Sequence, residues 1–374
     1  MRVYLDNAAT TAPYPEVFEA MKPYFTEVYG NPSSTHAIGR KARVAIEQAR
    51  RSIAGHIGAS ANEIIFTSGG TEADNIFLQG MAPAVGHIIS SPLEHPAVLQ
   101  TIAALAKSNL ADVSWLDLEK NGQISIDSLK KELSSHPASL VALMHGNNEV
   151  GNLLPLEEVS ILCKENNAHF FTDAVQTIGH YAFDLHTMNV TGLAASAHKF
   201  HGPKGVGFLY LKQGIKLSSV YKGGEQERGL SIGTENVAGI IGMSKALEIC
   251  HSRMNKQQQH ISLLKKTMMQ LLQDSIPGII FNGTSANLDK SINTVLSVSF
   301  AEHDENEMLL FNLDLANISV SAGSACASGA TKESHVLGAL GHDKRRATVR
   351  FSFSESNTVE ELIHVVDKLR EIFV

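Results

Sequence analysis

Short apolar segments alternate with longer segments of helical periodicity from about residue 60 to residue 250. The strand-like segments are Glu63–Thr67, His87–Ser90, Asp112–Leu116, Leu140–Met144, His169–Thr172 and Gly205–Leu211. Helix-like segments lie between them, at Ala97–Lys107, Ile126–Ser134 and Leu156–Asn166. This alternation predicts an α/β domain, in which a mostly parallel sheet is covered by helices on both faces. Ligands of such sheets bind at the carboxyl ends of the strands.

A different pattern follows this region. Two long helical segments, at about 234–250 and 254–273, precede a second alternating region after Pro277. That region contains strand-like segments near Thr294–Phe300, Ile318–Ser321 and Ala347–Ser352, and helix-like segments near Asp304–Ala316 and Thr358–Ile372. It predicts a smaller α+β domain.

Composition excludes several classes of protein. Of the 374 residues, 43% are hydrophobic and 18% are charged, as in a soluble globular protein. The net charge is −7 and no Lys/Arg run stands out, which argues against nucleic acid as a partner. No apolar stretch approaches the roughly 18 residues that span a bilayer, and the N-terminus has no apolar signal core, so we expect a cytoplasmic protein and no membrane partner. The three cysteines form no Cys-x-x-Cys pair and the 17 histidines show no ligand spacing, so we expect no metal.

The residues of most chemical interest are an acid and a lysine. Asp173 ends the apolar strand His169–Thr172, and Lys199 lies further along in Ser196-Ala-His-Lys. A lysine can form a Schiff base with the aldehyde of pyridoxal phosphate (PLP), and an acid can keep the pyridine nitrogen protonated, which makes the ring an electron sink. A His-Lys pair alone is more often a solvated loop, so the hypothesis depends on the other motifs.

Ser68-Gly-Gly-Thr71 follows a strand and opens a helix, and such a position suits a single phosphate. Gly70 permits close approach of the backbone and Thr71 adds a hydroxyl donor. The alternative is an ordinary helix start, with Thr71 as N-cap and Asp74 in a capping box. The Gly-Lys-Ser/Thr ending of a Walker loop is absent.

Three further side chains follow strand ends. Gln176 lies one turn beyond Asp173, and Asn148 follows the strand at 140–144. Both could donate to the phenolic oxygen of the cofactor. His95 follows the strand at 87–90 and could stack on the pyridine ring, although a lone histidine is more often structural.

A second distinctive element is Ser321-Ala-Gly-Ser-Ala-Cys-Ala-Ser-Gly-Ala330. Its small neighbours predict an accessible thiol at Cys326, which is the candidate nucleophile. Cys163 and Cys250 lie on helical patterns and are expected to be inert core thiols. Arg350 lies on an alternating strand, where it either faces outward or grips a substrate carboxylate with its planar fork.

Together these motifs resemble the cysteine desulfurases, PLP enzymes of the NifS/IscS-like group within the class V aminotransferases. The resemblance spans nearly the whole chain. Its motifs are Tyr4-Leu-Asp-Asn-Ala-Ala-Thr-Thr11, Gly30-Asn-Pro-Ser-Ser-Thr-His36, Ser68-Gly-Gly-Thr-Glu72, Asn147-Asn-Glu149, Asp173-Ala-Val-Gln176, His198-Lys199, Gly202-Pro-Lys-Gly205, Gly323-Ser-Ala-Cys326 and Val349-Arg-Phe-Ser352.

The resemblance implies the aspartate-aminotransferase-like fold (fold type I), with a large PLP-binding domain at 12–256 and a small domain at 257–374 joined by residues 1–11. It implies a homodimer that converts L-cysteine to L-alanine and passes the sulfur, as a persulfide, to an acceptor protein for iron–sulfur cluster assembly or other sulfur transfer. The implied catalytic residues are Lys199, Cys326 and His95. The implied cofactor contacts are Gly70, Thr71, His95, Asn148, Asp173, Gln176, Ser196, His198, Lys199 and, from the other subunit, Thr234. Asn148 and Arg350 would bind the substrate.

The chain departs from the family pattern in two places. Ser231-Ile-Gly-Thr234 stands where the family usually has Arg-Ser-Gly-Thr, which bears on substrate affinity or on the persulfide environment. The chain also ends soon after its last helix, where some relatives carry a longer tail that docks a scaffold protein. The alternatives are a selenocysteine lyase or a related PLP-dependent lyase on the same fold, or a non-catalytic sulfur carrier or scaffold. The intact Lys199, Asp173 and Cys326 argue against the last.

Overall fold

A seven-stranded sheet forms the centre of the larger part of the molecule. The structure is a computed structural model and describes residues 1–322 and 334–373. The sheet has the order β2-β8-β7-β6-β5-β3-β4, in which only β8 runs antiparallel to its neighbours. The strands are β2 (Ile64–Thr67), β3 (His87–Ser90), β4 (Asp112–Trp115), β5 (Leu140–Ala142), β6 (His169–Asp173), β7 (Gly192–Ser196) and β8 (Gly207–Leu211).

Helices cover both faces of this sheet, because alternate residues of each strand point to opposite sides. One face packs on α4 (Gly70–Val85) and α5 (Pro96–Lys107). The other packs on α3 (Ala37–His56), α6 (Ile126–Ser135), α7 (Leu156–Glu165) and the first half of α8 (Val237–Ser275). Phe170 and Phe171 illustrate the alternation, since these neighbours of β6 are buried in different cores. Two short helices, α1 (Pro15–Met21) and α2 (Pro23–Thr26), precede α3.

Among the described residues, the smaller part contains two short sheets, three α-helices of its own and the second half of α8. The antiparallel sheet β12-β10-β9 comprises β9 (Ile280–Phe281), β10 (Val295–Ser299) and β12 (Thr348–Ser352). A parallel pair joins β1 (Val3–Tyr4) to β11 (Ile318–Ser319), so the N-terminus belongs structurally to this part. The helices are α9 (Leu309–Leu315), α10 (His335–Ala339) and α11 (Val359–Phe373).

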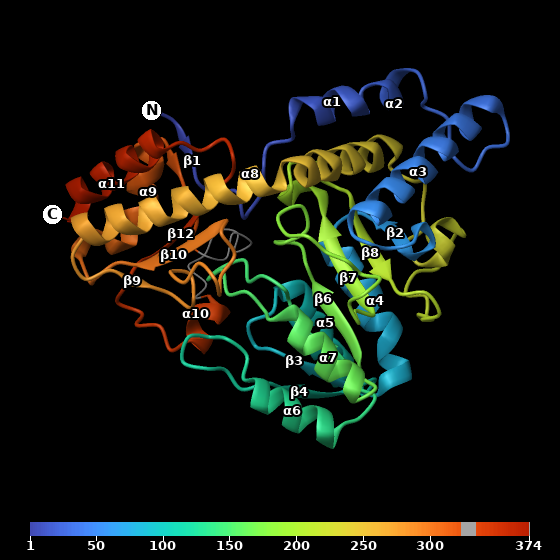
Figure 1. Cartoon of the computed structure of the whole chain (residues 1–374), viewed down its shortest axis with the longest axis horizontal. Coiled ribbons are helices and arrows are strands. Elements are labelled where there is room, and N and C mark those ends of the chain that lie inside the picture. Colours follow the sequence, from blue (N-terminus) through green and yellow to red (C-terminus); the bar gives the residue numbers. More distant parts are fainter. Residues whose placement is uncertain (323–333, 374) are drawn as a thin grey trace.

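Helix α8 extends along both parts, and Figure 1 shows it as the long yellow-orange helix that runs from one part to the other. Its buried residues belong to two separate hydrophobic cores: residues up to Cys250 join the core of the large sheet, and residues from Ile261 onward join the core of the small sheets. Val3 and Leu5 also lie in the second core. This distribution is consistent with the expected domains at 12–256 and at 257–374 with 1–11, which remain a proposal.

The sequence pattern missed one central strand. β7, with the sequence Gly-Leu-Ala-Ala-Ser, is buried throughout and its small residues give no alternation of apolar and polar positions. The pattern also predicted two long helices where the structure has the single helix α8. The polar run Lys256–His260, which we expected to be a solvated helix face, lies in α8 between its two sets of core residues, and only Gln257 of this run is buried.

Candidate active site

A cavity of about 500 Å³ opens at the carboxyl ends of the parallel strands. β3, β5, β6 and β7 each lead into a segment that lines it. The residues expected from the sequence that line it are Gly70, Thr71, His95, Asn148, Asp173, Gln176, Ser196, His198, Lys199 and Arg350. The fold therefore brings together ten of the twelve expected site residues.

Asp173, the last residue of β6, places a buried carboxylate in this cavity. Its Oδ1 accepts a hydrogen bond from the Val175 amide at 2.9 Å. Burial raises the pKa of this carboxyl group, while the neighbouring His95 and Lys199 oppose the rise. Asp74 of α4 is also buried beside it, with a pKa raised by burial and then by Asp173. An acid in such a setting can hold a proton on a nearby ring nitrogen.

Lys199 follows β7 at the end of a short 3-10 turn, Ala197–Lys199. Its ammonium donates hydrogen bonds to the carbonyls of Ala8 at 2.5 Å and Ala9 at 2.9 Å. The N-terminal segment thus holds this amine at the cavity wall. The solvated-loop interpretation of the His-Lys pair is wrong, because both residues are partly buried and line the cavity.

The amino end of α4 lines the same cavity as a cradle that is suited to an anion. Gly69 is the N-cap, with φ of 157°, so the expectation that Thr71 caps this helix is wrong. A Cβ on Gly70 would come within 2.5 Å of Val175 Cγ2, so any other residue there would require Val175 to shift. The first-turn amides have no intrahelical acceptor, and the helix end favours negative charge. Ser196 and His198 line the cavity from β7 and the turn after it, and the Nδ1 of His198 contacts Thr10 Oγ1 at 3.2 Å.

Burial keeps His198 neutral. Its pKa falls to about 4, first because of burial and then because of the charges of Lys199 and Lys204. A neutral imidazole can still donate one hydrogen bond to an anion.

Three side chains surround the region between acid and lysine. His95 is the N-cap of α5, where its Nδ1 accepts from the Ala97 amide at 3.2 Å, and burial lowers its pKa. Gln176 is buried and donates through Nε2 to the Ala8 carbonyl at 3.0 Å. Asn148 lies in the loop after β5 and accepts at its backbone carbonyl from Arg350 Nη1 at 2.8 Å.

Arg350 lies on β12 of the small part but reaches this cavity. It is only 1% exposed, so the outward-facing alternative is wrong. Its Nη2 donates to Asp6 Oδ1 at 2.8 Å, which is an ion pair within the wall of the cavity. The guanidinium is therefore held by groups from two separate segments of the chain, the N-terminal segment and the loop after β5.

Cys326 lies outside the described residues, but both neighbouring segments meet the site. Ser321 donates through its hydroxyl to Asp6 Oδ1 at 2.7 Å, and the Arg350 amide donates to its carbonyl at 2.7 Å. On the other side, the Ser334 hydroxyl donates to the carboxylate of Glu149, which lines the cavity. The described residues on either side of 323–333 therefore contact residues at or next to the cavity.

Thr234 lies elsewhere, in a neighbouring hollow that it shares with Thr71 and Gly205. Ser231, at the position where the family usually has arginine, donates to Glu72 Oε1 at 3.0 Å. Within one chain Thr234 is therefore not part of the main cavity.

Sequence reasoning gave no role to several residues that line the cavity. Asp74 was considered only as part of a helix cap, and the N-terminal residues 8–10 were quoted only as a family motif. Glu149 likewise appeared only within a motif. The motif that contains residues 8–10 could have indicated their place in the site. The proximity of Asp74 to Asp173 could not be predicted, because it depends on how α4 packs across β6.

Comparisons with known proteins agree with this geometry. The family model Aminotransferase class-V matches residues 3–365. The chain is 43% identical to cysteine desulfurase IscS of Dictyoglomus turgidum, covering 99% of this chain and 94% of that one, and 41% identical to putative cysteine desulfurase IscS 1 of Bacillus subtilis, covering 99% of both. A solved NifS-like protein superimposes with a TM-score of 0.91 at 36% identity, covering 100% of this chain and 99% of the other.

The chain belongs to the class-V aminotransferase family, and within it to the cysteine desulfurases. PLP is the cofactor of this family, and the expected α/β fold is confirmed. The cavity fits that cofactor: it offers a lysine amine, a buried carboxylate and a glycine-bounded helix end at which a Cβ would clash. A solved relative, SspA, is described in complex with cysteine and has a TM-score of 0.81 at 31% identity, covering 96% of this chain and 100% of the other.

Proposed function

We propose that this cysteine desulfurase removes sulfur from L-cysteine in the cavity that Asp173, Lys199 and Arg350 line, and passes it as a persulfide on Cys326 to an acceptor. The overall change is L-cysteine plus an acceptor thiol to L-alanine plus a persulfide. The observation that carries the proposal is the meeting of an amine, a buried acid, an anion cradle and a fixed guanidinium in one cavity. The anion cradle and the guanidinium would serve binding of cofactor and substrate, and the amine and the buried acid would serve proton transfer.

Binding comes first. The amino end of α4, with Gly70 and Thr71, would hold the phosphate of PLP together with Ser196 and His198. Asn148 and Gln176 would contact its phenolic oxygen, and His95 would lie against the ring. Arg350 would bind the carboxylate of L-cysteine through its planar fork, with Asn148 beside it. The ion pair with Asp6 fixes the direction of that fork.

Proton transfer follows. When bound, PLP withdraws electrons from the α-carbon of the substrate, so that a proton can leave it. Asp173 would keep a proton on the ring nitrogen, because its buried carboxylate and that nitrogen share a charge-assisted hydrogen bond. Lys199 would take the α-proton and act as general base and acid on the substrate carbons. The carbonyls of Ala8 and Ala9 hold the amine in the cavity beforehand.

Sulfur transfer is assigned to Cys326. Its thiolate would attack the sulfur of the substrate, forming the S–S bond of a persulfide while the carbon–sulfur bond breaks. The electron pair of that bond stays with the carbon, which is then protonated to alanine. The other two thiols are unsuited to this role, because burial raises the pKa of both Cys163 and Cys250 to about 12.

The partners follow from the same proposal. L-Cysteine would be the substrate, a second copy of the chain would complete the site with Thr234, and a sulfur-acceptor protein would receive the persulfide. Within the described residues no helix is long and apolar enough to cross a membrane. A cytoplasmic location and the lack of a nucleic-acid partner remain predictions from the sequence.

One assay separates the candidate functions. The purified protein with bound PLP is incubated with L-cysteine and a thiol, and alanine and persulfide are measured. A desulfurase forms both. A selenocysteine lyase forms alanine from selenocysteine and little from cysteine, and a sulfur carrier forms none. Failure to form alanine from cysteine, with PLP bound, would refute the proposal.

A further inference from the structure

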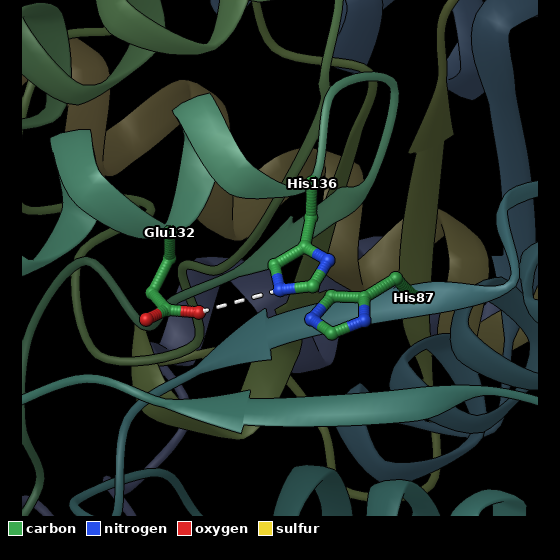
Figure 2. A group of neighbouring side chains, drawn as sticks. All are labelled: His87, Glu132 and His136. Carbon is green, nitrogen blue, oxygen red and sulfur yellow. Dashed lines mark ion pairs between the residues drawn. The ribbon is translucent and has the colours of Figure 1, made fainter.

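Three side chains from two distant segments of the chain meet away from the active site. His87 is the first residue of β3, Glu132 lies near the end of α6, and His136 is the C-cap of that helix (Figure 2). The cavity lies at the carboxyl ends of the strands, whereas this cluster lies at the amino end of β3. None of the three residues lines the cavity. We call His87, Glu132 and His136 the histidine cluster.

The geometry of the histidine cluster is compact. The two imidazole rings stack with centroids 3.7 Å apart and planes 7° apart. His136 Nε2 lies 3.8 Å from Glu132 Oε2, since residues four apart share one face of a helix. One nitrogen or oxygen from each residue lies within 4.8 Å of those of the other two. All three residues are half-buried, so water and ions can reach them.

The charges favour a cation at this position. Two imidazole rings stacked 3.7 Å apart disfavour a proton on both rings at once. Neutral imidazole is the form that binds a metal. The carboxylate of Glu132 adds the negative charge that a divalent ion requires. His87 Nε2 also contacts Ser114 Oγ at 3.0 Å, which orients the ring.

We propose that the histidine cluster binds a zinc ion, with water as a fourth ligand. Two imidazole nitrogens and one carboxylate oxygen match zinc, whereas magnesium and calcium prefer sets made only of oxygen. Zinc bonds are about 2.0–2.2 Å long and lie in the plane of each imidazole ring, so the ligand atoms must move closer together and one ring must turn out of the stack. The side chain of His136 can make this movement, because it is 39% exposed at a helix end.

Zinc at this position would join two elements that are distant in the sequence. His87 is fixed in the central sheet, while Glu132 and His136 belong to α6 on its surface. The unfolded chain does not hold these three ligands together, so zinc would favour the folded state and raise its melting temperature. The histidines show no regular spacing in the sequence, so the expectation of no metal did not consider the histidine cluster. The desulfurase reaction does not use this cluster.

The test is a titration of the full-length, PLP-bound protein with ZnCl₂, followed by calorimetry and by thermal melting. His87→Gln and His136→Gln each remove one nitrogen ligand, and Glu132→Gln removes the charge but keeps the shape. The matched control is His251→Gln. Its ring contacts that of His56 at 4.8 Å and 39°, and these two histidines belong to no such set with a carboxylate among the described residues. The thiol of Cys326 can also bind zinc, but it is present in all five proteins and cancels in the comparison.

We expect His87→Gln and His136→Gln to bind one zinc fewer per chain, or to bind it at least tenfold more weakly, than the wild-type protein. Both should lose the rise in melting temperature that zinc produces, and Glu132→Gln should show an intermediate loss. MgCl₂ should change nothing. Equal zinc binding in the wild-type protein and both histidine variants would overturn the proposal, as would an equal loss in His251→Gln.

Folding of the variants is checked in the same experiment. Without zinc, the cofactor absorbance and desulfurase activity should match those of the wild-type protein, since none of the substituted residues lines the cavity; the rise in melting temperature is measured for each variant from its own zinc-free value. If His87→Gln fails this check, His136→Gln still decides the matter, because its side chain lies at the surface.

Discussion

The guanidinium of Arg350 and the carboxylate of Asp6 form an ion pair at 2.8 Å, although 344 residues separate them in the chain. The pair brings the first strand region and the last strand to one wall of the cavity. The carboxylate of Asp6 also accepts a hydrogen bond from Ser321, which directly precedes the segment that carries Cys326. With the roles proposed for Arg350 and Cys326, substrate binding and sulfur transfer would both depend on Asp6.

Arg350→Ala should reduce kcat/KM for L-cysteine by roughly 10- to 150-fold, mainly through KM. It removes a charge-assisted contact of about 1.5–3 kcal/mol with the substrate carboxylate. Asp6→Asn keeps the guanidinium but removes its ion pair, so it should cause a smaller rise in KM. Steady-state kinetics on both variants provide the measurement. An unchanged KM in Arg350→Ala would show that another group binds the carboxylate.

Lys199→Ala should abolish turnover and the visible absorbance of the lysine-bound cofactor. The neighbouring Lys204 also lines the cavity and is the matched control. It lies beyond the Gly-Pro turn, whereas Lys199 directly follows β7 and is held by the Ala8 and Ala9 carbonyls. Lys204→Ala should keep the absorbance of the wild-type protein. If Lys204→Ala loses the absorbance and Lys199→Ala keeps it, the Schiff-base lysine is Lys204.

Cys326→Ala should keep PLP bound and lose alanine and persulfide formation. The loss of a nucleophile that forms a covalent bond cannot be offset by acid–base effects worth about 10²–10⁴-fold. Cys163→Ala and Cys250→Ala are the controls, because both thiols are buried and their pKa is raised to about 12. Mass spectrometry after incubation with L-cysteine locates the persulfide. A persulfide on a control thiol, with Cys326→Ala active, would contradict the assignment.

The sequence predicted the sheet and most of the cavity because both depend on local pattern. The carboxyl ends of parallel strands meet at one edge, so strand-end residues such as Asp173 and Asn148 could be placed together before the structure was known. The burial of Arg350 could not be predicted in this way. An alternating strand has two faces, and the choice between them depends on the packing of the small part against residues near the N-terminus.

Two other features depend on packing between distant segments. Asp74 resembles a capping residue in the sequence, but α4 places it in the core beside Asp173. The histidine cluster requires α6 to pack near the start of β3, and no spacing in the sequence reveals that. The strand β7 could not be predicted for another reason. It is buried on both faces, so its sequence shows no alternation of apolar and polar residues.

Lys265 should make stability depend on pH. Its side chain is fully buried and donates to Ser291 Oγ at 2.7 Å and to the Ile292 carbonyl at 2.8 Å. Burial lowers its pKa from 10.5 to about 7. Between pH 7 and pH 10.5 the unfolded chain holds a proton on this lysine and the folded chain does not. The free energy of unfolding therefore increases as the pH is raised through this range.

Raising the pH from 7 to 9.5 should therefore stabilise the wild-type protein relative to Lys265→Met, by up to about 3 kcal/mol. Lys266→Met is the control. Lys266 is next to Lys265 in the chain but its side chain is exposed, so this variant should show the pH dependence of the wild-type protein. Thermal melting of the three proteins at both pH values measures the effect. The same pH dependence in all three would show that Lys265 keeps its ordinary pKa in the folded state.

Thr234 should serve the cofactor of the other subunit in a homodimer. Within one chain it lies in the hollow beside the main cavity, next to Thr71 and Gly205. Thr234→Val should weaken PLP binding by about 0.5–1.5 kcal/mol, because it removes one hydroxyl donor. Cofactor binding and dimerisation would then be linked equilibria.

Mixed dimers of Thr234→Val and Lys199→Ala subunits test the sharing of the site directly. If the site is shared, the subunit that keeps Lys199 receives an intact Thr234 from its partner, so each mixed dimer has one complete site. Its PLP affinity at that site should then match the wild type, whereas Thr234→Val homodimers bind PLP more weakly. If Thr234 serves its own chain, no complete site forms and the mixed dimer shows no recovery. An active monomer in light scattering at working concentration would equally count against a shared site.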